Sequence, residues 1–180
     1  SIFYAERVVD SLPVPHWLKP AAGGLAIGAI AVEFPHILGA GYEATDAALN
    51  ELLPLWLLLC LIPLKTAATA ISLGCRFGGG VFSPSLYIGA MTGGAFGIIA
   101  AVVFPDLAAS HGAYAIVGMS ALAAATLGAP ISTILIVFEL TGDYQITVAV
   151  MLATSIATVI VHQAKGRSFF HWQLENRGLN

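Results

Sequence analysis

The residues best suited to chemistry lie in one short glycine-rich stretch, Gly78 to Pro84, inside an otherwise apolar sequence. Ser83 is a typical helix N-cap and Pro84 suits the first position of a helix, so the stretch predicts a helix that starts at about residue 84. The first N–H groups of a helix have no acceptor within it, and the helix dipole makes that end partly positive. Away from water, a bound anion would satisfy these groups. The glycines equally allow a second interpretation, in which they only form a tight turn between two helices.

No other set of residues predicts catalysis, a metal or a cofactor. The sequence has no GxSxG, HExxH or GxxxxGK[ST] motif, and no two carboxylates share an apolar segment. Cys60 and Cys75 lie in or beside apolar segments and are expected to be small buried hydrophobic residues. The histidines show no ligand spacing: His16, His36, His111, His162 and His171. We therefore expect neither an enzyme nor a metal- or cofactor-binding protein.

The composition predicts an integral membrane protein. Hydrophobic residues make up 58% of the 180 residues and charged residues only 9%, whereas soluble domains carry about 25% charge. Between Phe77 and Ala164 there is no Lys or Arg, and the acids are Asp106, Glu139 and Asp143. The expected partner is therefore the lipid bilayer. A net charge of −3 gives no indication of nucleic-acid binding.

The apolar segments predict an all-α, multi-pass protein with tilted and broken helices. A perpendicular spanning helix needs about 20 apolar residues, and several segments are shorter or contain proline, as with Pro54 and Pro63. Irregular backbone is tolerated in a membrane only where protein buries it or it lines a watery cavity. The segments are 20–34, 52–74, 85–104, 113–128, 130–140 and 146–163. This texture is typical of a transporter or channel interior.

Small residues recur every fourth position and predict close helix packing. They are Gly89, Gly93 and Gly97 on one segment and Ala121 and Ala125 on another.

Charges at the segment ends predict the orientation in the membrane. Basic residues follow the last apolar segment at Lys165, Arg167 and Arg177, which predicts a cytoplasmic C-terminus in the cell (inner) membrane. Lys65, inside an apolar segment, is expected to snorkel or to pair rather than to act directly. Glu139 is expected to be an interface or capping group.

Two blocks of sequence resemble the CLC family of chloride channels and proton–chloride exchangers. Gly80-Val81-Phe82-Ser83-Pro84 resembles the GxFxP motif of that family, and MSALAAATLGAPISTILIVFELTGDYQ at 119–145 resembles a second block at the expected distance. The resemblance extends over essentially the whole chain. It implies that residues 1–180 form a single transmembrane fragment, the C-terminal half of a CLC-type pore domain and thus the second half of an inverted repeat.

The resemblance also implies site residues. The backbone N–H groups of Val81, Phe82 and Ser83 would face the chloride ion that is transported, and the Phe82 side chain would line its path. Phe170 would stand where the family has a tyrosine whose hydroxyl contacts the anion. Segments 130–163 would provide half of a homodimer interface.

Motifs of the family's first half are not found in this sequence. GAGYE at 39–43 does not fit the gating-glutamate loop, because it lacks the basic residue and the proline. Channel and exchanger therefore both stay open. Another broken-helix transporter for a different anionic substrate is the main alternative, ahead of an intramembrane enzyme or a structural scaffold.

Overall fold

The chain folds into helices packed side by side in the computed structural model, which describes residues 18–39, 41–75, 80–105 and 110–165. No strand occurs over these ranges, which confirms the predicted all-α class. The elements are α2 (Lys19–Glu33), the 3-10 helix η1 (Pro35–Ile37), α3 (Tyr42–Leu49), α4 (Leu55–Gly74), α5 (Phe82–Val103), α6 (His111–Leu127), α7 (Pro130–Thr141) and α8 (Tyr144–Lys165).

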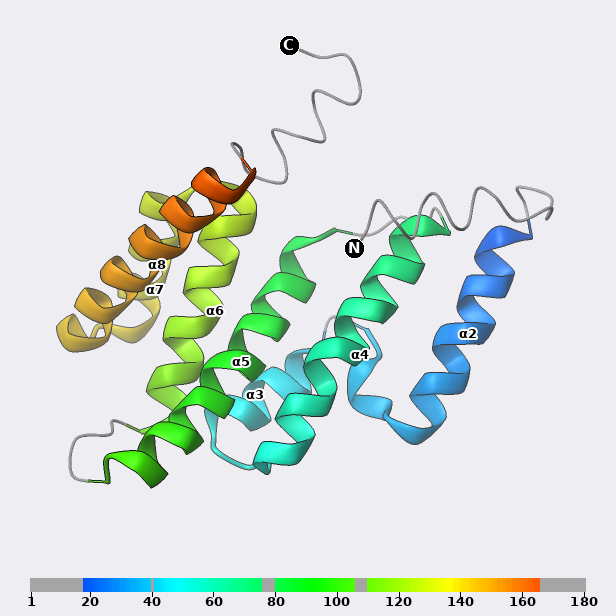
Figure 1. The fold of residues 1–180 in the computed structure, drawn as a ribbon, viewed down its shortest axis with the longest axis horizontal. Coiled ribbons are helices and arrows are strands. Elements are labelled where there is room, and N and C mark those ends of the chain that lie inside the picture. Colours follow the sequence, from blue (N-terminus) through cyan, green and yellow to red (C-terminus); the bar gives the residue numbers. More distant parts are fainter. Residues whose placement is uncertain (1–17, 40, 76–79, 106–109, 166–180) are drawn as a thin grey trace, which may run out of the picture.

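Successive helices from α4 to α8 run in alternating directions (Figure 1). The most extensive packing joins α5 to α6, and α5 also packs against α4. On the other side, α6 packs against α8, while the short α3 lies against α5 and α6. The elements on either side of the glycine-rich stretch, α4 and α5, are therefore central in the fold.

Within the described ranges, three helices are long and apolar enough to cross a membrane: α4, α5 and residues Tyr144–Ala164 of α8. The apolar helices α6 and α7 are shorter, with 17 and 12 residues, as the sequence predicted. The break expected in segment 52–74 is not found, because α4 continues through Pro63. Proline removes one helical hydrogen bond, and the buried Leu58 and Leu61 on the same helix anchor the turns before it.

The predicted glycine face is the contact between α5 and α6. A Cβ atom added to Gly89 would lie 2.6 Å from the Gly118 carbonyl oxygen, and one added to Gly93 would overlap the Tyr114 backbone. A Cβ atom added to Gly97 would lie 3.1 Å from the His111 Cα. On α6, Ala125 is buried and Ala121 is half-buried. Only hydrogen at these glycine positions lets the two backbones approach this closely.

Most hydroxyl groups on the helices from α4 to α8 bond to the backbone one turn earlier in the chain. Each of these side chains donates a hydrogen bond to the carbonyl oxygen four residues earlier: Thr66, Thr69, Ser85, Thr92, Ser120, Thr126, Thr133, Thr141, Thr147, Thr154, Ser155 and Thr158. These helices can therefore present serine and threonine to an apolar environment.

Candidate functional site

The glycine-rich stretch leads into the first turn of α5. The helix begins at Phe82, within two residues of the predicted start, but its N-cap is Val81 rather than Ser83. The Val81 carbonyl accepts the first helical hydrogen bond from the Ser85 N–H, at 3.1 Å, and a second from the Ser85 hydroxyl, at 2.7 Å. Pro84 is consequently the third residue of the helix, whereas the sequence predicted it to be the first. It is tolerated there because its missing N–H belongs to the first turn.

This helix start is open in the part of the chain that the structure describes. Gly80 is exposed and not helical, and a Cβ atom added to it would meet nothing within 4 Å. The Phe82 side chain is 45% exposed, while Val81 and Ser83 are half-buried. Gly78, Gly79 and Phe170 lie outside the described residues, so Phe170 is not placed relative to this turn. The open turn leaves room for a ligand or for another segment against Phe82.

A buried ammonium group lies between α4 and the loop that follows η1. Lys65 is only 3% exposed, and its Nζ donates hydrogen bonds to the carbonyl oxygens of Ile37, at 2.8 Å, and Gly39, at 2.9 Å. The same Nζ lies 4.9 Å from the centre of the Tyr87 ring, a cation–π distance. Lys65 therefore pairs with backbone carbonyls and a ring and does not snorkel to an interface.

Tyr87 connects this ammonium to α5. Its ring is fully buried, and its hydroxyl donates to the His36 carbonyl oxygen at 3.3 Å. Gly41 has a φ of +81° and lies so close to the Tyr87 ring that an added Cβ would overlap it. Gly39, with a φ of +59°, also adopts a left-handed backbone. The G-x-G spacing at 39–41 is the sequence signal that could have located this loop.

The helix start and the ammonium belong to the same region of the fold. Tyr87 follows Phe82 by five residues, a rise of about 7.5 Å along the helix. Among the described residues, no carboxylate pairs with Lys65. The first turns of α5 thus combine the positive end of a helix dipole with a nearby cation that no acid neutralises. Such a region favours an anion over a cation.

The cysteines and Glu139, which the sequence also singled out, form no further binding site among the described residues. Among the described residues, no group of three His, Cys, Asp or Glu side chains could hold a metal. Cys75 is buried as predicted, but Cys60 is exposed, because it lies on a face of α4 that no described segment covers. Glu139 is exposed near the end of α7, and its interface or capping role stays a prediction.

Comparison with known proteins matches this chain to chloride channels and chloride exchangers. The family model described as voltage gated chloride channel matches residues 2–162. The chloride channel protein CLC-f of Arabidopsis thaliana is 37% identical over 163 residues, covering 84% of this chain and 21% of the relative. The H(+)/Cl(-) exchange transporter ClcA of Vibrio cholerae is 36% identical over 156 residues, covering 87% of this chain and 33% of the relative.

A solved structure extends the likeness to three dimensions. The X-ray structure of a slow cyanobacterial Cl−/H+ antiporter superimposes with a TM-score of 0.81 at 27% sequence identity, covering 98% of this chain and 42% of that one. The chain thus spans between about a fifth and two fifths of the length of the proteins it matches. These relatives carry the names of channels and transporters, not of enzymes.

Proposed function

The chain belongs to the voltage-gated chloride channel (CLC) family, and from this premise we propose that it forms the C-terminal half of a protein that carries chloride across a membrane. Residues 1–180 then constitute a single transmembrane fragment, with the rest of the pore contributed by the other half. The relatives named as chloride channel and exchange transporter support this assignment. Chloride is the transported ion, and the site needs no cofactor.

The open start of α5 beside the buried Lys65 is the observation that carries the proposal. In this proposal the backbone N–H groups of Val81, Phe82 and Ser83 hold the anion, and the exposed Phe82 ring lines its path. Hydrogen bonds from N–H groups to a charged acceptor are worth roughly 1.5–3 kcal/mol each. Backbone donors attract an anion without the full positive charge that would trap it.

Lys65 strengthens the same site from a distance. Its Nζ contacts the Tyr87 ring on α5, and in this proposal its charge raises the electrostatic potential at the start of that helix. Because the Nζ of Lys65 is held by two carbonyl oxygens, the ammonium stays back from the anion and raises the local potential without contacting it. The anion is then attracted to the site but is not held by a direct ion pair, so it can also leave quickly.

The exposed apolar faces of the last two helices support a homodimer through segments 130–163. The exposed side chains on this part of the chain are Ile131, Leu135, Ile136, Leu140, Val148, Met151, Leu152, Ile156, Val159 and Ile160. We assign this surface to a second copy of the protein with lipid around it. Placement in the cell (inner) membrane with a cytoplasmic C-terminus is part of the same proposal, and it rests on the basic residues after α8.

An amide-to-ester substitution tests the anion site most directly. Replacing the Phe82 residue by its α-hydroxy acid in the full-length protein removes one N–H and keeps the ring. The expected result is about ten-fold weaker chloride binding or more by calorimetry. The matched control is the same substitution at Phe96, which lies on the same helix remote from its start. If both esters weaken binding equally, or neither does, the N–H of Phe82 does not hold the anion.

A further inference from the structure

Glu51 occupies a backbone conformation that its residue type disfavours. Its φ is +62°, and it is the one non-glycine residue with a positive φ in the described ranges. It follows Asn50, the C-cap of α3. Its N–H donates to the Ala48 carbonyl at 3.3 Å, and the Leu52 N–H donates to the Ala47 carbonyl at 2.9 Å. This is the Schellman pattern, in which glycine usually occupies the position of Glu51.

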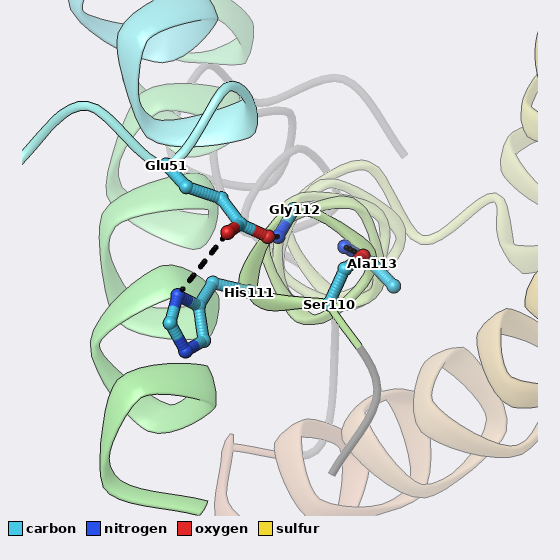
Figure 2. A network of polar contacts seen from close by, with 5 residues as sticks. All are labelled: Glu51, Ser110, His111, Gly112 and Ala113. Atoms are coloured by element: carbon cyan, nitrogen blue, oxygen red, sulfur yellow. Dashed lines mark hydrogen bonds and ion pairs between the residues drawn. The ribbon is translucent and has the colours of Figure 1, made fainter. Parts of the chain in front are cut away.

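The Glu51 carboxylate bridges to the first turn of α6, as Figure 2 shows. Its Oε1 accepts a hydrogen bond from the Gly112 N–H at 3.2 Å, and its Oε2 lies 3.5 Å from Nδ1 of His111. Ser110, the N-cap of α6, accepts from the Ala113 N–H at 3.2 Å. Two of the N–H groups at this helix start are therefore satisfied by side chains, one of them from a distant loop.

The two segments are also in direct backbone contact. A Cβ atom added to Gly112 would overlap the Leu49 carbonyl oxygen, so the last turn of α3 rests on the first turn of α6. Glycine at 112 permits this approach, and the left-handed Glu51 turns its carboxylate toward the helix start. A residue in a costly conformation that makes such specific contacts indicates a role beyond ending α3.

We propose that Glu51, His111 and the Gly112 N–H form an acid-responsive brace between the α3–α4 loop and α6. Histidine is the residue type that gains charge between pH 8 and pH 5. A positive charge at a helix N-terminus is unfavourable, because the helix dipole is positive there. The Glu51 carboxylate offsets that charge and pairs with it, so Glu51 contributes more to the brace at pH 5 than at pH 8. His111 and Glu51 are 31% and 41% exposed, so both are accessible to protons.

No other described acid competes with Glu51 for the imidazole. The elements packed against α6 are α3, α5, α7 and α8, and α5 meets His111 with Gly97. None of their titratable groups forms an ion pair with His111: Tyr42, Glu43, Asp46, Tyr87, Glu139, Asp143, Tyr144 and His162. Asp106, which precedes α6 in the sequence, lies outside the described residues and is therefore included as a variant in the test.

The brace joins the α3–α4 loop to α6. The loop that it holds leads directly into α4, which carries Lys65, and α6 is the main packing partner of α5. The contact lies near the end of α5 that is remote from Phe82, since Gly97 faces His111. The brace is therefore separate from the proposed anion site and does not depend on which ion the protein carries.

Hydrogen exchange of the full-length protein at pH 8 and pH 5 tests the brace. The measured quantity is the protection factor of the α6 first turn, corrected for the intrinsic rate at each pH, in wild type, Glu51→Gln, His111→Gln and the double variant. Exposed ion pairs contribute up to about 1 kcal/mol. The ratio of wild-type to Glu51→Gln protection should therefore be about two- to five-fold larger at pH 5 than at pH 8. In the His111→Gln background this ratio should not change with pH.

Two further variants separate the brace from simpler explanations. Glu51→Gly removes the carboxylate but suits the left-handed backbone, so the α3 end should keep its protection while the α6 first turn loses it. Asp106→Asn should retain the wild-type pH response. The proposal is overturned if the Glu51→Gln ratio is the same at both pH values, if it still varies without His111, if Glu51→Gly leaves α6 protected, or if Asp106→Asn abolishes the response.

Discussion

Among single residues, Lys65 holds two distant segments of the chain together through its ammonium group. Its two carbonyl partners belong to a loop 26 and 28 residues earlier in the chain. The bonds therefore tie α4 to the segment between η1 and α3. A charge buried in an apolar helix is stable only when its donors are used in this way.

Lys65→Met should destabilise the protein by about 2–4 kcal/mol, because the Ile37 and Gly39 carbonyls lose a donor and unsatisfied buried acceptors cost roughly 1–3 kcal/mol each. Denaturant unfolding of the full-length protein in detergent measures the change. Leu64→Met, on the same helix and partly buried, is the control and should cost less than about 1.5 kcal/mol. Equal effects of the two variants would mean that the ammonium bonds contribute little.

Phe170 is predicted to stand where the family has a tyrosine. If it stands opposite the α5 turn, Phe170→Tyr adds a hydroxyl donor and should tighten chloride binding by about ten-fold or somewhat more. Calorimetry on the full-length protein measures binding, with chloride flux alongside. Phe169→Tyr places the same hydroxyl one residue away and should leave binding unchanged. A Phe170→Tyr variant with unaltered binding and flux would remove Phe170 from the site.

The start of α5 could be predicted from the sequence to within two residues, but the long-range contacts of Lys65 and Glu51 could not. The open turn at Phe82 follows from local residue types, because glycine, serine and proline have known positions around helix starts. Even there the observed N-cap is Val81 and not the predicted Ser83, because the Ser85 N–H and hydroxyl both donate hydrogen bonds to the Val81 carbonyl. The contacts of Lys65 and Glu51 depend on the tertiary fold, and no local pattern encodes them.

At the scale of helices, the α5–α6 contact depends on hydrogen at the glycine positions. Gly93→Ala places a methyl group into the Tyr114 backbone, and overpacking of this kind typically costs about 1–3 kcal/mol. Gly28→Ala is the matched control, since Gly28 is also helical and an added Cβ would meet nothing within 4 Å. That control should be neutral or stabilising by up to about 1 kcal/mol.

The comparison uses thermal or denaturant unfolding of both variants in the same detergent. A Gly93→Ala protein as stable as Gly28→Ala would show that the two helices can separate slightly at no cost, and the close packing would then not be a requirement of the fold.

Most helices could be predicted, and the exceptions have physical reasons. Apolar segments 113–128, 130–140 and 146–163 correspond to α6, α7 and α8 within two residues at each end. α3 was missed because it has only eight residues and mixed polarity, so its contacts with α5 and α6 give it its place. Pro63 predicted a break in α4, but the helix continues through it, with Leu58 and Leu61 buried against the rest of the fold. Tertiary packing therefore decides the secondary structure where the local sequence preference is weak.

At the scale of the whole molecule, the proposed function requires more surface than this chain supplies. The Phe82 side chain and the outer faces of α7 and α8 are exposed, and the relatives are between about two and four times as long as this chain. The 180-residue chain reconstituted alone in liposomes should therefore give no chloride flux above that of empty liposomes. Flux should return when the full-length protein is reconstituted at the same amount. Substantial chloride flux through the isolated chain would contradict the half-pore assignment.

The hydroxyl groups that bond within their own helix have a consequence for how the protein is made. A membrane helix usually enters the bilayer before its neighbours are in place, and any bare polar group then meets hydrocarbon. In α4 to α8, most serine and threonine donors already have a carbonyl partner four residues back, as with Thr154 and Val150. These hydroxyl groups can therefore enter lipid with their donors already bonded. Lys65 cannot, because its carbonyl partners at Ile37 and Gly39 lie outside α4, so this helix needs its neighbouring segment before its ammonium is satisfied.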